Sequence, residues 1–152
     1  MRDRLVTVIR PCVAFALVAP LLGAATARGA GEESAAIRIA SVKVRTTKPG
    51  GAAWDAGGGA PDLRVSIEKR ARPAGEKFTT KVIRDTFEAK FRVTTIRVKD
   101  GDEVEITVTD EDAAGDDQVG RLKKRVTAEM FREGEAEWSF GEVLSLRVEF
   151  VD

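Results

Sequence analysis

The sequence predicts an all-β protein, an antiparallel sandwich or barrel of about eight short strands with one short helix. Apolar residues alternate with polar residues over several short segments, which is the pattern of strands that bury one face. Turn-forming residues separate these segments, and only one stretch has the spacing of a helix. The chain of 152 residues is 43% hydrophobic and 33% charged, as is typical of a globular domain.

The strands follow from this alternation, taken in chain order. Leu63, Val65 and Ile67, for example, alternate with polar residues, so one face of their strand is expected to be buried. Between Ile39 and Val42 the alternation changes phase, which indicates a β-bulge. The expected strands are 37–44, 63–67, 78–83, 87–93, 96–98, 104–108, 135–140 and 144–150.

Two further signals describe how the chain turns. Asp100-Gly101 lies between two alternating apolar runs, which predicts a hairpin. Residues 127–133 have the spacing of a helix, with Thr127 as a candidate N-cap and Gly134 as the residue that ends it.

The N-terminal segment has the order of a secretory signal. Arg2, Arg4 and Arg10 precede a charge-free apolar run of 17 residues, 11–27, which ends in the small-x-small sequence Ala25-Thr26-Ala27. A retained membrane anchor is the alternative, but the run falls short of the ~20 residues that span a bilayer. We therefore expect a signal peptide over 1–27, a disordered leader over 28–36 and a β-sandwich domain over 37–152. The protein is expected to be secreted or periplasmic, with no transmembrane span after cleavage.

Cleavage after Ala27 is the first testable prediction. The exported protein is expected to begin at Arg28, because the small residues that signal peptidase requires end at Ala27. Intact-mass analysis of exported protein measures this directly. A chain that retains Met1 would instead indicate an anchor.

Composition excludes several kinds of active site. The chain has no His, so the most common catalytic base and zinc ligand are absent. Its single cysteine, Cys12, lies in the apolar N-terminal run and cannot form an internal disulfide. No motif for nucleophilic catalysis is present, so we expect that the protein is not an enzyme.

Acidic residues gather in two inter-strand loops. The first loop has the sequence WDAGGGAPD, in which three consecutive glycines allow Asp55 and Asp62 to point at one place. The second, DEDAAGDD, carries Asp110 and Asp112 on one side of an extended backbone and can return Asp117 toward them. Together these five carboxylates supply the hard oxygen ligands that Ca²⁺ requires, about six to eight in number.

Two other interpretations apply to these loops. Asp and Gly are common in exposed turns, so each loop taken alone is more simply a soluble turn. An EF-hand is excluded, because the twelfth position counted from Asp110 is Arg121, where that motif needs a bidentate Glu. The calcium hypothesis therefore depends on the two loops meeting in space.

The order of these loops and strands resembles a C2 domain, a β-sandwich known for Ca²⁺-dependent phospholipid binding. In that family the third calcium loop has the form D-x-D, a spacer and then D-x-[IV]-G. Asp110, Asp112 and Asp117-Gln118-Val119-Gly120 match this form, and Asp55 and Asp62 match the acidic pair of the first loop. The resemblance implies an eight-stranded antiparallel β-sandwich with Asp55, Asp62, Asp110, Asp112 and Asp117 as Ca²⁺ ligands.

The resemblance also implies a function. We expect a Ca²⁺-binding module that recognises an anionic surface, either phospholipid head groups or polysaccharide, and no nucleic-acid partner. Trp54 is either an interfacial anchor or part of the core above the first loop. The alternative function is a structural or protein-interaction domain, in which Ca²⁺ only rigidifies the loops or does not bind.

Overall fold

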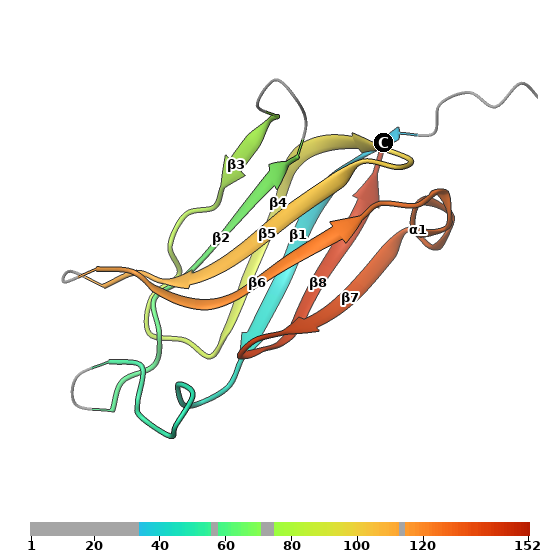
Figure 1. The fold of residues 1–152 in the computed structure, drawn as a ribbon. Coiled ribbons are helices and arrows are strands. Elements are labelled where there is room, and N and C mark those ends of the chain that lie inside the picture. The colour runs from blue at the N-terminus through green and yellow to red at the C-terminus, as the bar shows by residue number, and fades with distance from the viewer. Residues whose placement is uncertain (1–33, 56–57, 71–74, 113–114) are drawn as a thin grey trace, which may run out of the picture.

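The computed structural model describes residues 34–55, 58–70, 75–112 and 115–152. Within these residues eight strands form two antiparallel four-stranded sheets, and one short helix joins β6 to β7 (Figure 1). The elements are β1 (Ser34–Val44), β2 (Leu63–Lys69), β3 (Lys77–Thr79), β4 (Glu88–Lys99), β5 (Glu103–Asp110), β6 (Asp117–Arg125), α1 (Ala128–Glu133), β7 (Glu135–Phe140) and β8 (Val143–Val151). The strand orders are β4-β1-β8-β7 in the first sheet and β3-β2-β5-β6 in the second. The predicted β-sandwich is confirmed.

The structure corrects several of the expected strands. Segments 87–93 and 96–98 form a single strand, β4, which runs without a break from Glu88 to Lys99, and the expected strand 78–83 shortens to β3. Conversely, β6 is absent from the expected set, because only Val119 and Gly120 are buried in it and its polar residues do not alternate cleanly with apolar ones. Strand β6 forms because it pairs with β5 over its whole length, from Glu103↔Arg125 to Asp110↔Asp117.

The N-terminal boundary also moves. Strand β1 begins at Ser34, and Ala35 and Ala36 are buried, so the last three residues of the expected leader 28–36 belong to the domain. The expected signal peptide, 1–27, and residues 28–33 lie outside the described residues. The predicted bulge is confirmed, since the register of β1 shifts between Ile39 and Ser41 against both neighbouring strands.

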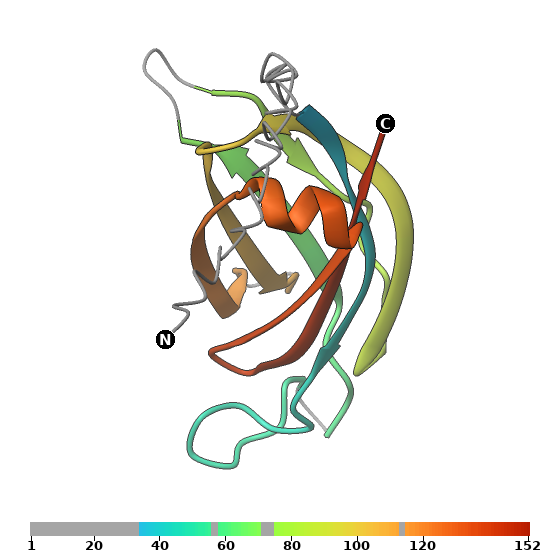
Figure 2. The ribbon, with the colours of Figure 1, turned by 90° about the vertical axis from the view of Figure 1, so that its right-hand side faces the viewer.

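The core lies between the two sheets, which Figure 2 shows almost edge-on. Alternation in the sequence becomes alternation in burial: Leu63, Val65 and Ile67 in β2 have no exposed surface. Residues of β1 and β8 supply the opposing layer. At ~25 cal/mol per Å² of apolar surface, this burial is the main term that stabilises the fold without disulfides.

Helix α1 lies at one end of the sandwich and ends as predicted, with Gly134 in the left-handed region at φ 76°. Thr127 occupies the N-cap position, but its side chain makes no capping hydrogen bond. Instead, the amide of Ala128 donates to Oδ1 of Asp100 in the β4–β5 hairpin at 2.9 Å. The hairpin therefore holds the start of the helix. None of the helices in the described residues is long and apolar enough to cross a membrane.

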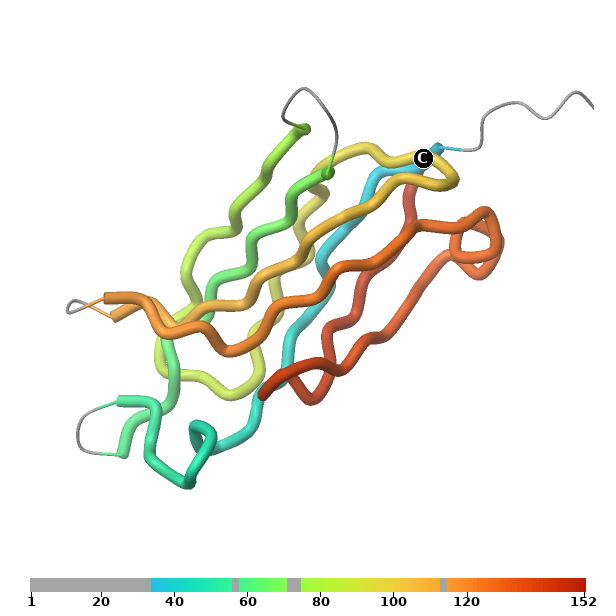
Figure 3. Tube along the Cα trace, viewed as in Figure 1, coloured from blue at the N-terminus to red at the C-terminus, as the bar shows by residue number. Residues whose placement is uncertain are grey.

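The other end of the sandwich gathers the described parts of three connections, 45–55 with 58–62, 80–87, and 111–112 with 115–116, as the trace in Figure 3 shows. Backbone hydrogen bonds join them. The amide of Thr86 donates to Pro61 O at 3.0 Å, and the amide of Glu111 donates to Asp62 O at 2.9 Å. These bonds tie the two acidic segments found in the sequence to each other and to the β3–β4 connection.

Candidate metal centre

Strand register brings the acidic residues together at one end of the second sheet. Strand β5 lies between β2 and β6, and its last residue, Asp110, is paired with Leu63 on one side and Asp117 on the other. Asp62 immediately precedes Leu63, so it lies beside Asp110 as well. The sandwich thus places next to each other residues that are nearly fifty positions apart in the chain.

Asp110 continues the buried face of β5. Val104, Ile106 and Val108 point into the core, and the same alternation points the carboxylate of Asp110 inward, so this residue has 0% exposure. Its Oδ1 accepts a hydrogen bond from the amide of Asp62 at 2.7 Å. Its Oδ2 is buried and has no hydrogen-bond partner among the described residues. A buried carboxylate oxygen without a donor is destabilising by about 1–3 kcal/mol or more, which a bound cation would offset.

Asp55 is positioned by its neighbour Trp54. The Trp54 side chain is only 3% exposed, packs in the core and donates from Nε1 to Arg45 O at 2.8 Å. The core alternative for Trp54 is therefore confirmed and the interfacial anchor is wrong. Gly59 closes over Asp55, since a Cβ added there would lie 3.0 Å from Asp55 Oδ2. A larger residue at position 59 would therefore crowd Asp55, which explains why one of the three consecutive glycines is needed.

Three of the five predicted ligands converge. Asp55, Asp110 and Asp112 each offer a carboxylate oxygen, and these oxygens lie within 4.8 Å of one another. Burial raises the pKa of Asp110, and the neighbouring charges of Asp112 and Asp55 raise it further. Partial desolvation and the charge of Asp112 likewise raise the pKa of Asp55. Both directions report crowded negative charge that a divalent cation would relieve.

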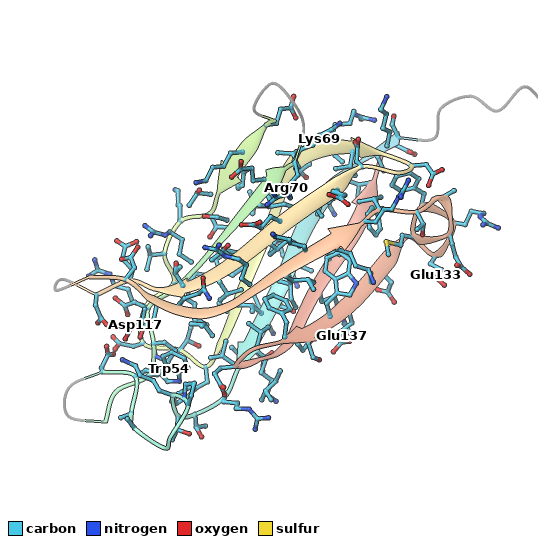
Figure 4. The ribbon with its side chains drawn as sticks, viewed as in Figure 1. Trp54, Lys69, Arg70, Asp117, Glu133 and Glu137 are labelled. Carbon is cyan, nitrogen blue, oxygen red and sulfur yellow. The ribbon has the colours of Figure 1, made fainter. Side chains whose placement is uncertain are left out.

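The other two predicted ligands lie beside this group with partners of their own. Asp62 Oδ1 accepts a hydrogen bond from the amide of Asp85 at 2.9 Å, and Asp62 Oδ2 lies 3.7 Å from Arg84 Nε. Asp117 forms an ion pair with Lys48. Figure 4 shows Asp117 and Trp54 at the loop end of the sandwich.

Lys48 lies beside the candidate metal centre, and the sequence analysis did not identify it. Its Nζ is 5.7 Å from the centre of the Trp54 ring, and its hydrogen bond to Asp117 raises the Lys48 pKa, with further contributions from Asp112 and Asp110. Lys48 follows two threonines and precedes a Pro-Gly-Gly turn, so nothing in its local sequence marked it. Its ammonium group partly neutralises the carboxylates of Asp117, Asp112 and Asp110.

Lys48→Met is expected to strengthen Ca²⁺ binding. The change removes a positive charge that repels the ion and releases Asp117, while the apolar stem over Trp54 is kept. We expect a gain in Ca²⁺ affinity of about fivefold. Calorimetric titration with CaCl₂ measures it. Lys124→Met, a change of the same charge on β6, is the control, and equal affinities for the two variants would contradict a role for Lys48.

Ca²⁺ affinity is also expected to fall as the pH is lowered. The raised pKa values of Asp55 and Asp110 mean that these groups take up protons before ordinary carboxyls do, and protons compete with the ion. The loss should therefore develop between pH 7 and the ordinary carboxyl range near ~4. Titrations at constant ionic strength check this. An affinity that does not change down to that range would show that these carboxylates do not hold the ion.

Several basic side chains at the second sheet form ion pairs within the protein. Lys69 lies 2.5 Å from Asp102, and Arg70 lies 2.5 Å from Glu105. Glu105 also lies within 4 Å of Arg121 and Lys123. These four basic side chains therefore take part in ion pairs at the second sheet.

A family model matches the part of the chain that builds this geometry. The model of the C2 domain covers residues 38–139, which include both acidic loops and the strands from β1 to β7 in whole or in part. The chain belongs to the C2 domain family. C2 domains commonly bind Ca²⁺ and phospholipids. The matched region thus agrees with the resemblance seen in the sequence.

Solved C2 domains share the fold at low identity. The human GIVD cytosolic phospholipase A2 superposes with a TM-score of 0.59 at 21% identity, over 78% of this chain and 16% of that enzyme. A C2 domain of a plant extended synaptotagmin 1 gives 0.57 at 12% identity, over 78% of this chain and 92% of that one. Calcium-bound extended synaptotagmin 2 gives 0.53 at 21% identity, over 78% of this chain and 45% of that one. A search of curated proteins found no match.

Proposed function

We propose that this C2 domain binds Ca²⁺ between its acidic loops and uses the bound ion to recognise an anionic phospholipid surface outside the cytoplasm. The observation that carries the proposal is Oδ2 of Asp110, a buried carboxylate oxygen with no donor in the described part of the chain, beside two other carboxylates. A bound cation would stabilise such an arrangement. The oxygen ligands favour a hard ion such as Ca²⁺.

The bound ion would change how the loop end interacts with other molecules. Without metal, the three carboxylates give this end a negative potential that repels anionic lipid. Binding of Ca²⁺ adds two positive charges and moves the local potential toward positive values. Lipid phosphate oxygens would then complete the coordination that Asp55, Asp110 and Asp112 begin.

Docking by this route would be shallow and electrostatic. Among the described residues the exposed large hydrophobic side chain is Leu144, at 40% exposure, and it lies in β8 rather than on a loop tip. The described tips carry small residues such as Gly58, Gly59 and Gly115. Binding should therefore weaken as salt is added, since exposed charges are screened over ~10 Å at 0.1 M salt.

Sedimentation with vesicles tests the proposal. Vesicles of phosphatidylcholine and phosphatidylserine are expected to sediment the protein with CaCl₂ and not with EDTA, and pure phosphatidylcholine vesicles are expected to leave it in solution. Calcium binding in a titration without any vesicle binding would favour the alternative, in which the ion only rigidifies the loops. If the protein bound an anionic polysaccharide and not phosphatidylserine, the proposed partner would be wrong and the proposed Ca²⁺ binding would still stand.

A further inference from the structure

A second charged site lies on the outer face of the first sheet, away from the acidic loops. A hollow of about 460 Å³ opens there over β1, β4 and β8. Its charged and hydroxyl lining comes from Arg38, Ser41, Lys90, Arg92, Arg147 and Glu149. We refer to it as the basic hollow, because four of these side chains are cationic and one is anionic.

Irregular backbone in two neighbouring strands forms the basic hollow. Ala40 of β1 has no paired residue in β4 or in β8. Opposite it, Phe91 and Arg92 of β4 have no paired residue in β1, because Ile39 pairs with Val93 and Ser41 pairs with Lys90. Arg92 has φ 50°, a left-handed conformation that non-glycine residues rarely adopt. A strained residue persists only where its surroundings hold it, and β-bulges often re-aim side chains at binding sites. The backbone of β1 and β4, and not side-chain conformation alone, therefore contributes to the shape of the basic hollow.

The cations of the basic hollow are only partly neutralised. Arg38 pairs with Glu149 at 3.2 Å, and Arg147 lies 3.5 Å from Glu137 of β7. Lys90 and Arg92 form no ion pair with any described residue. The basic hollow therefore contains two positive charges, those of Lys90 and Arg92 on β4, that no described carboxylate neutralises.

We propose that the basic hollow binds a phosphate monoester group, independently of Ca²⁺. A phosphate monoester carries about −1.5 to −2 charges at pH 7, which matches the two unpaired cations. The planar guanidinium of Arg92 suits two phosphate oxygens at once, and Lys90 supplies a compact charge beside it. The hydroxyl of Ser41 is a further donor in the lining. The group can belong to a soluble metabolite or to the head group of a phosphatidic-acid-type lipid.

The site is separate from the calcium loops in chemistry as well as in position. Four of its five charged side chains are cationic, and they come from strands of the first sheet, with Arg38 and Arg147 in the middle of β1 and β8 and with Lys90 and Arg92 near the start of β4. Binding in EDTA therefore reports on the basic hollow alone. Failure of the calcium proposal would leave this one standing, and the reverse also holds.

The test uses two probes in EDTA: glycerol 3-phosphate, followed by NMR chemical-shift titration, and sedimentation with vesicles of phosphatidylcholine containing phosphatidic acid. The variant is Lys90→Gln/Arg92→Asn, in which asparagine tolerates the left-handed backbone. The control is Arg97→Gln/Lys124→Gln, which removes the same charge from β4 and β6 outside the hollow. Both variants keep the apolar core intact.

We expect at least one probe to bind the wild-type protein, the hollow variant to bind it at least tenfold more weakly, and the control to bind within about twofold of wild type. Binding of glycerol 3-phosphate would assign a soluble ligand, and binding of the vesicles alone would assign a lipid head group. The proposal is overturned if neither probe binds, or if the two variants lose binding equally, since that result would reflect net charge only.

Discussion

Replacing Asp110 with asparagine is expected to abolish Ca²⁺ binding and, at the same time, to stabilise the metal-free protein. The substitution removes a buried negative charge from a group whose pKa burial already raises. The amide oxygen can still accept the hydrogen bond from the amide of Asp62, and the new NH₂ group can donate to the carboxylates of Asp55 and Asp112. We expect a gain of about 1–3 kcal/mol in EDTA and a loss in Ca²⁺ affinity of at least about 100-fold.

The two effects have opposite signs, which separates a metal site from an acidic loop. Urea unfolding with EDTA and with CaCl₂ measures both, together with a calorimetric titration. Glu103→Gln is the matched control, because Glu103 is exposed at the other end of the same strand and loses the same charge. Its stability should change by less than about 0.5 kcal/mol in either condition. If Asp110→Asn behaved like this control, Asp110 would not be a ligand.

Calcium is expected to raise the melting temperature of the wild-type protein. A ligand that binds only the folded state stabilises it by RT ln(1 + [L]/Kd), which is about 2.7 kcal/mol at about 100 times Kd. The ligand oxygens come from segments that separate on unfolding, so the unfolded chain should bind the ion poorly. Extracellular calcium modules often have Kd values of about 10⁻⁴ to 10⁻³ M, so the scan needs CaCl₂ in the millimolar range or above.

Calorimetric or fluorescence melting scans in EDTA and in CaCl₂ make the measurement. MgCl₂ at the same ionic strength is the control for general screening, because Mg²⁺ dehydrates reluctantly and favours strict octahedral geometry. Asp110→Asn should show no calcium-dependent shift. An identical melting temperature of the wild-type protein in EDTA and in CaCl₂ would rule out the calcium centre, although the C2 fold would remain.

Sequence pattern determined most of the fold, because strand alternation is local. The period of two in β2, β5 and β8 follows from which residues bury one face, and it needs no knowledge of the partner strand. The bulge in β1 and the Gly134 helix end were visible for the same reason. Strand β6 was missed because its pairing with β5, more than its own pattern, holds it in place. The division of β4 was wrong because a strand with an irregular register loses its alternation locally.

The acidic residues of the candidate metal centre were likewise visible in the sequence, since both loops follow or precede a clear strand. The sequence by itself determined which carboxylates were available and at which end of the sandwich they lie. Only the tertiary structure decided that Asp55, Asp110 and Asp112 form the group, while Asp117 pairs with Lys48. The physical reason is that electrostatic interactions depend on distance in space and not on separation along the chain. Strand register places carboxylates from separate segments within a few ångströms of one another. The charge of Lys48, which comes from another loop, then pairs with Asp117.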